Sequence, residues 1–169
     1  MLDGMAFPES LKALWAPWRV EYYSAQKRPD FLEEAARAED DRAHLVVHRL
    51  RETFLILNRY PYSVGHLMAV PYRKVADVGD LSEGERRELW EQAAYAQGLL
   101  RRVLRAEGFN IGLNIGSAGG AGYADHLHLH IVPRWEGDTN FMPVLADTRV
   151  MTQSLESLWE LLRAAAEEG

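Results

Sequence analysis

The sequence predicts an α+β domain built on a mostly antiparallel sheet, and three observations carry this prediction. Short runs of β-favouring residues recur along the chain, one long amphipathic segment separates the first three runs from the last two, and a second amphipathic segment follows them. Strands grouped on either side of one helix, without strict strand–helix alternation, are typical of antiparallel sheets. The 169 residues correspond to a single domain of ordinary size.

The first three runs are expected to form an antiparallel meander. The ranges 45–47 and 53–57 are separated by a polar turn, and 65–71 follows a second turn that contains Asn58 and Pro61. Valine, isoleucine, phenylalanine and threonine favour strands, whereas asparagine and proline favour turns. The turns therefore divide this region into three strands.

The long helix is expected to begin after Ser82. Ser82 and Glu85 have the spacing of a capping box, in which each side chain bonds the other residue's backbone N–H. The apolar residues that follow recur with a period near 3.6, and Gly108 suits a C-terminal cap. The apolar set is Leu89, Trp90, Ala93, Ala94, Leu100, Val103 and Leu104.

Two further strands are expected near 109–116 and 126–134, joined by a glycine-rich loop, and the range 152–167 is expected to form the C-terminal helix. Apolar residues at positions i, i+3, i+4 and i+7 give this helix one apolar face. They are Leu155, Leu158, Trp159 and Leu162.

The first 44 residues are expected to form an N-terminal arm. The range 1–24 is rich in aromatic rings, which must pack somewhere because a large exposed apolar patch is a liability. The range 25–44 is the most charged and is expected to be an exposed helix or loop. The predicted organisation is a single domain over 1–169, with this arm, a core at 45–145 and the C-terminal helix.

The composition excludes several classes of protein. Cysteine is absent, which excludes disulfides and thiolate metal sites. A net charge of −6 provides no global basic field for nucleic acid or anionic lipid. No apolar stretch approaches the roughly 20 residues of a membrane-spanning helix, and the N-terminus does not resemble a signal peptide. We therefore expect a cytoplasmic protein without nucleic-acid or membrane partners.

Three histidines, His126, His128 and His130, lie two residues apart. On a strand, side chains with this spacing share one face, while Leu127 and Leu129 point to the other. Buried imidazoles need polar partners, so such a row indicates a functional cleft. The alternative is a solvated edge strand, on which threonine, lysine or glutamate would be more usual.

The loop before the histidines contains Gly116, Gly120 and Gly122 and follows Asn114. Glycine lets backbone N–H groups close around an anion such as phosphate, although a tight hairpin connection explains the loop equally well. It is not a P-loop, because no Gly-Lys-Ser/Thr sequence follows it.

Two chemistries fit three clustered imidazoles. One is a metal site, since three histidines can hold catalytic zinc. The other is metal-independent phosphoryl or nucleotidyl transfer, in which the central imidazole attacks phosphorus. Three ligands from one strand fit a single ion poorly, which favours the nucleophilic chemistry modestly.

The segment 126–132, His-Leu-His-Leu-His-Ile-Val, resembles the signature of the histidine-triad (HIT) superfamily of nucleotide hydrolases and transferases. The segments 14–19, 57–71, 121–135 and 137–143 are similar to the bacterial branch associated with diadenosine tetraphosphate breakdown. The resemblance implies a HIT-like fold with a five-stranded sheet, one long central helix and a homodimer. It also implies cleavage of a dinucleoside polyphosphate, with phosphorolysis favoured over hydrolysis. No cofactor is required beyond Mg²⁺ that could accompany the substrate.

The resemblance implies a role for each histidine of the triad. His128 would be the nucleophile and carry the nucleotidyl group, oriented by the backbone carbonyl after it. His130 would lie close to the phosphate, and His126 would assist the leaving group or steady the charge. A general purine nucleoside phosphoramidase and a non-catalytic nucleotide sensor remain as alternative functions.

Other positions receive implied roles together with a simpler structural alternative. Asn58 would bind ribose or merely cap its turn, and His66 would support the triad as a buried structural histidine. Asn114 and the glycines of the loop would line the phosphate path, and Trp135 would border the site or only pack. Many relatives carry a zinc-binding Cys-x-x-Cys element where this chain has the range 30–33 without cysteine, so that zinc site is not expected.

Overall fold

The computed structural model describes residues 31–138 and 153–168. The aromatic segment 1–24 and the range 139–143 of the family resemblance lie outside these residues. The elements are α2 (Phe31–Arg37), β1 (Val46–Arg49), β2 (Thr53–Leu57), β3 (Leu67–Pro71), η1 (Val78–Asp80), α3 (Glu83–Leu104), β4 (Gly108–Leu113), η2 (Ser117–Gly119), β5 (Leu129–Arg134) and α5 (Leu155–Glu167).

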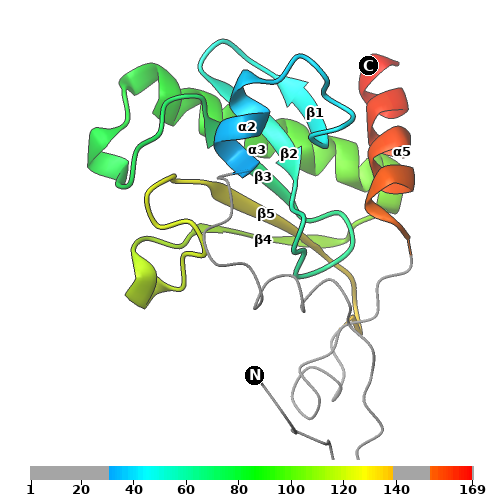
Figure 1. Ribbon diagram of the computed structural model, residues 1–169. Helices are drawn as coiled ribbons and strands as arrows, with labels where there is room; N and C mark the ends of the chain where they lie inside the picture. Colours follow the sequence, from blue (N-terminus) through cyan, green and yellow to red (C-terminus); the bar gives the residue numbers. More distant parts are fainter. Residues whose placement is uncertain (1–30, 139–152, 169) are drawn as a thin grey trace, which may run out of the picture.

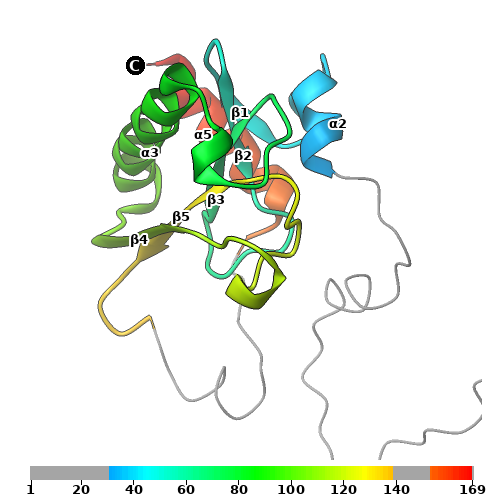
Figure 2. The same cartoon turned by 90° about the vertical axis from the view of Figure 1, so that its left-hand side faces the viewer.

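The five strands form one sheet in the order β1-β2-β3-β5-β4, and every neighbouring pair is antiparallel (Figure 1). The predicted α+β class, the meander and the five-stranded sheet are thereby confirmed. Helix α3 packs on β2, β3 and β5, α5 packs on α3 and β1, and Figure 2 shows α2 on the side of the sheet away from α3. No helix in the described ranges is long and apolar enough to span a bilayer.

The two faces of β5 have different neighbours. A Cβ placed on Gly65 would touch the side chains of Leu100 and Leu104 in α3 and of Pro133 in β5. Pro133 therefore faces α3, and because strand side chains alternate, Ile131 does so as well. His130 points to the opposite face, away from the main helical layer.

The beginning of α3 agrees with the sequence, but its end does not. Ser82 is the N-cap, and both hydrogen bonds of the predicted capping box are present. The C-cap is Arg105, in the left-handed conformation with φ 54°, while Gly108 already opens β4. Trp90, expected on the apolar face, is 62% exposed.

Two other boundaries correct the sequence analysis. Strand β5 begins at Leu129 rather than at residue 126, because the N–H of Leu127 donates to the Val75 carbonyl (2.7 Å) instead of continuing the ladder with β3. The segment expected to be exposed contains α2, whose Phe31, Leu32 and Ala35 are buried in the core.

Candidate active site

The candidate site lies on the sheet face opposite α3, around His130. In the ladder, His130 is opposite Met68 of β3 and Gly112 of β4. A Cβ on Gly112 would meet nothing within 4 Å, so this glycine leaves space beside the histidine. The His128 ring contacts the His130 ring edge-on, with centroids 4.7 Å apart. The structure thus brings these two side chains together although only His130 belongs to the regular strand.

His128 is held in one tautomer by a backbone carbonyl. Its Nδ1 lies 2.8 Å from the carbonyl oxygen of His126. A carbonyl can only accept, so in the neutral ring the proton is on Nδ1 and the lone pair is on Nε2. The orienting carbonyl therefore precedes His128 by two residues, whereas the family resemblance implied the carbonyl after His128.

His66 and His130 form a second hydrogen-bonded pair with a defined proton order. The N–H of Tyr62 donates to His66 Nδ1 (3.1 Å), so the proton of a neutral His66 is on Nε2. That nitrogen lies 2.9 Å from His130 Nδ1 and donates to it. His130 then carries its own proton on Nε2, 3.3 Å from Nδ2 of Asn114. Two N–H donors cannot bond each other, so this proton order requires the Asn114 amide to be turned so that its oxygen faces His130.

Burial, followed by the proximity of His128, lowers the pKa of His130 to about 4. Desolvation disfavours the charged ring, and a neighbouring imidazole adds to the effect. His130 is therefore neutral at pH 7 and presents an Nε2–H donor.

This lowered pKa predicts a loss of stability in mild acid. An unfolded histidine binds a proton near pH 6.5, whereas folded His130 rejects it down to about pH 4. Above pH 6.5, His130 is neutral in both the folded and the unfolded protein and its protonation does not affect stability. As the pH falls from 6.5 towards 4, the free energy of unfolding decreases by up to about 3 kcal/mol. Urea unfolding at pH 5 and pH 7.5 measures this change. A His130→Asn variant should lose the corresponding part of the pH dependence, and an unchanged dependence would contradict the assignment.

Asn58 and His126 make contacts that secure the surrounding backbone. Asn58 Oδ1 accepts from the N–H of Tyr60 (2.8 Å), and its Nδ2 lies 3.3 Å from His66 Nδ1. These contacts correspond to the turn-capping alternative, and ribose binding stays a prediction. His126 is fully buried, and its Nε2 donates to the carbonyl of Pro71 at the end of β3 (3.0 Å).

The glycine-rich loop is not an open nest of amides. Gly116 and Gly120 have positive φ values of 68° and 85°, which favour glycine. However, the N–H groups of Gly119 and Ala121 bond to the Gly116 carbonyl, and that of Gly120 bonds to Ser117. The loop therefore uses these three amides to close its own turn, and the phosphate roles of Gly116 and Gly120 stay predictions. Gly122 takes no part in those bonds, and its phosphate role stays a prediction.

Trp135 follows β5 and packs against the end of α3. Its indole N–H donates to the carbonyl of Leu104 (3.2 Å), and its backbone N–H donates to Asp138. The described contacts are those of a packing residue rather than of a member of the histidine cluster. The sequence pattern could not distinguish these roles, since a tryptophan after a strand suits both.

Side chains from α2 hold the loop that leads to His126. Phe31 meets the Tyr123 ring edge-on at 5.2 Å. Lys74 pairs with Asp125 at 3.0 Å and with Glu33 of α2 at 3.6 Å. Glu33 belongs to the segment where many relatives carry the zinc-binding cysteines. Within 31–138 and 153–168, no three histidine or acidic side chains are grouped so that they could hold a metal ion.

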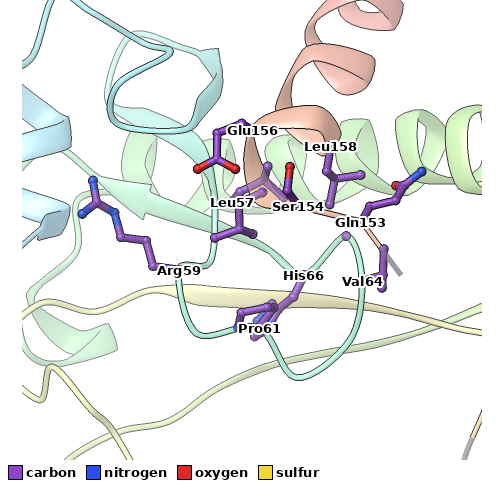
Figure 3. A pocket seen from close by; sticks show the side chains of 11 residues that line it. Leu57, Arg59, Pro61, Val64, His66, Gln153, Ser154, Glu156 and Leu158 are labelled. Carbon is purple, nitrogen blue, oxygen red and sulfur yellow. The ribbon is translucent and has the colours of Figure 1, made fainter. Parts of the chain in front are cut away.

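A cavity of about 470 Å³ lies between the turn after β2 and the start of α5 (Figure 3). Leu57, Val64 and Leu158 contribute apolar wall, and His66 also lines it. The guanidinium of Arg59 points away from the other lining side chains in Figure 3 and lies over the Phe31 ring at 5.6 Å. His66, at the end of the turn after β2, therefore lines this cavity while its Nε2 contacts His130.

Comparison with known proteins identifies clear relatives. The family model for the HIT domain matches residues 40–137. An AP-4-A phosphorylase of Mycobacterium tuberculosis is 38% identical over 168 residues, covering 94% of this chain and 86% of the relative. An asymmetrical bis(5'-nucleosyl)-tetraphosphatase of Schizosaccharomyces pombe is 30% identical and covers 55% of this chain and 50% of its own length. The crystal structure of a zinc-bound histidine triad family protein from Mycobacterium smegmatis superposes with a TM-score of 0.61 at 27% identity, covering 73% of this chain and 84% of that one.

Proposed function

This chain belongs to the HIT domain family, and from that premise we propose that it is an enzyme that cleaves dinucleoside polyphosphates, with diadenosine tetraphosphate as its substrate. The observation that carries the proposal is the 2.8 Å contact between His128 Nδ1 and the His126 carbonyl. It places the lone pair of a neutral imidazole on Nε2, as a nucleophile requires. The phosphorylase and tetraphosphatase relatives support the substrate class.

In the first step, Nε2 of His128 attacks the α-phosphorus of the dinucleotide. A P–N bond forms, the bond between this phosphorus and the bridging oxygen breaks, and ATP departs with the electron pair of that bond. The ring keeps its Nδ1 proton and so becomes an imidazolium that carries AMP. The His126 carbonyl stabilises this positive charge through a charge-assisted hydrogen bond.

The neutral state of His130 favours this intermediate. Its ring centroid is 4.7 Å from that of His128. A second positive charge at this distance would oppose the imidazolium by about 3.5 kcal/mol at an effective dielectric constant near 20. Neutral His130 instead carries a proton on Nε2, which would exchange its contact with Asn114 for a phosphate oxygen of the substrate. This arrangement suits a protein of net charge −6, whose polyanionic substrate needs local donors.

The second acceptor decides the products. Inorganic phosphate attacks the AMP on His128, restores the imidazole and yields ADP, whereas water yields AMP. We propose phosphate, supported by the phosphorylase relative that covers 94% of this chain. The protein is proposed to require no cofactor of its own, with Mg²⁺ accompanying the polyphosphate.

We also propose that the active form is a cytoplasmic homodimer. Strand β4 is an edge strand, and its segment Gly108–Leu113 carries no charged residue. Unprotected edges of this kind readily pair with another strand. Arg101 of α3 lies over the Phe109 ring of β4 at 5.1 Å, so the last turns of α3 adjoin the same edge.

Incubation with diadenosine tetraphosphate, with and without inorganic phosphate, tests the function. We expect ATP and ADP in equal amounts when phosphate is present. ATP and AMP in the presence of phosphate would show that water is the acceptor. Faster turnover of an adenosine phosphoramidate in parallel would favour a phosphoramidase, and tight binding without product would indicate a sensor.

A further inference from the structure

We propose that Tyr62 is a positioning residue of this site, whose ring shields the His66–His130 hydrogen bond from water and so keeps His130 neutral. The inference rests on the proposed nucleotidyl transfer at His128, because a neutral neighbour matters most when His128 becomes positively charged. Neither the family match nor the signature histidines assign a role to Tyr62.

The three rings form one compact cluster. The Tyr62 centroid lies 4.6 Å from that of His66 and 5.5 Å from that of His130, and the two imidazoles are 5.0 Å apart. Tyr62 is 42% exposed, His130 is 7% exposed and His66 is fully buried. Tyr62 is therefore the outermost ring, and its removal would admit water to the two imidazoles.

The backbone of Tyr62 acts on the same pair. Its N–H donates to His66 Nδ1 at 3.1 Å, which directs the Nε2–H of His66 at His130 Nδ1. A proton added to His130 Nδ1 would face that donor at 2.9 Å. The two groups could coexist only if His66 reversed its tautomer, and the Tyr62 N–H opposes this reversal.

The other neighbours of His130 do not stabilise its charged form. Its hydrogen-bond and ring partners are His66 from the start of β3, His128 before β5, Asn114 after β4, and Tyr62. Gly112, opposite it in β4, has no side chain. None of these groups is a carboxylate, so among the surroundings that residues 31–138 and 153–168 provide, water is the remaining group that could solvate the charge, and the Tyr62 ring limits its access.

The test compares Tyr62→Ala with Tyr62→Phe, which keeps the ring and removes only the hydroxyl. NMR titration of the His130 ring, with its signal assigned by comparison with His130→Asn, measures the pKa of this group. In Tyr62→Ala the pKa should rise by one unit or more above the value of about 4 in the unaltered protein. In Tyr62→Phe it should stay low. The acid limb of the kcat profile should move upward in the alanine variant. Its activity at pH 5 relative to pH 8 should fall about twofold if the pKa reaches about 5, while the phenylalanine variant keeps the wild-type ratio.

An unchanged His130 titration in Tyr62→Ala, or a phenylalanine variant that behaves like alanine, would overturn the proposal. If Tyr62→Ala does not fold, Tyr62→Leu provides a smaller apolar cover and should show an intermediate pKa. The titration is measured without substrate. If the variants show these pKa shifts but the wild-type protein forms no product, the proposed function is contradicted and the shielding role of Tyr62 stands.

Discussion

Replacement of His128 by alanine is expected to lower the turnover of diadenosine tetraphosphate by several orders of magnitude while the fold survives. Alanine has no nitrogen to form the covalent intermediate, and water or phosphate would have to attack the substrate directly. The His128 ring bonds the His126 carbonyl and contacts the His130 ring, and it does not belong to the apolar core cluster, so the fold is expected to survive its truncation. Steady-state kinetics together with thermal unfolding measure both effects.

His48→Ala is the matched control for this experiment. His48 stacks on Tyr95 at 4.3 Å and contacts Gln92 at 2.9 Å, on the helical side of the sheet. This variant should keep its turnover. Activity of His128→Ala within about tenfold of wild type, a barrier difference of only ~1.4 kcal/mol, would contradict the nucleophile assignment. Mass spectrometry of the quenched wild-type reaction should locate the adenylyl group on His128, and its appearance on another residue would be equally decisive.

The second large effect is expected from Gly65→Ala, which should destabilise the protein by about 2–3 kcal/mol. Gly65 has a φ of 78°, and a Cβ there would lie 2.5 Å from Leu104 Cδ1 and 3.0 Å from Leu100 Cδ2. The substitution therefore combines a left-handed backbone with overlap against α3. Thermal unfolding should show a midpoint roughly 5–10 °C lower.

Gly98→Ala is the control for this substitution. Gly98 lies within α3, and a Cβ there would meet nothing within 4 Å. Alanine should stabilise that helix by about 0.5–1 kcal/mol, because glycine loses more backbone freedom on folding. If Gly65→Ala and Gly98→Ala change the thermal unfolding midpoint by the same amount and in the same direction, the close packing of Gly65 against α3 does not determine the effect of its substitution.

Neighbouring residues determine the features that the sequence predicted correctly. The five strands follow from short β-favouring runs, and the start of α3 follows from a Ser82–Glu85 box that closes within one turn. The pairing of His128 with His130 follows from the two-residue repeat of an extended chain. The error at Trp90 arose because a local pattern does not reveal which helix face the sheet will cover. The error at Gly108 arose because Arg105 adopts the left-handed C-cap conformation that glycine usually provides.

Only the tertiary structure decided which nitrogen of His126 and of His130 carries a proton. The bond from His66 to His130 joins residues 64 positions apart, and the partner of His126 is the Pro71 carbonyl, 55 positions away. Tyr62 lies on the turn that carries His66, and no sequence pattern indicated its contact with the two imidazoles. A repeat of side chains can specify a strand and its faces, because both depend on local backbone geometry. The protonation of a buried ring depends on the donors and acceptors that folding places against it, and for His126 and His130 these come from distant parts of the chain.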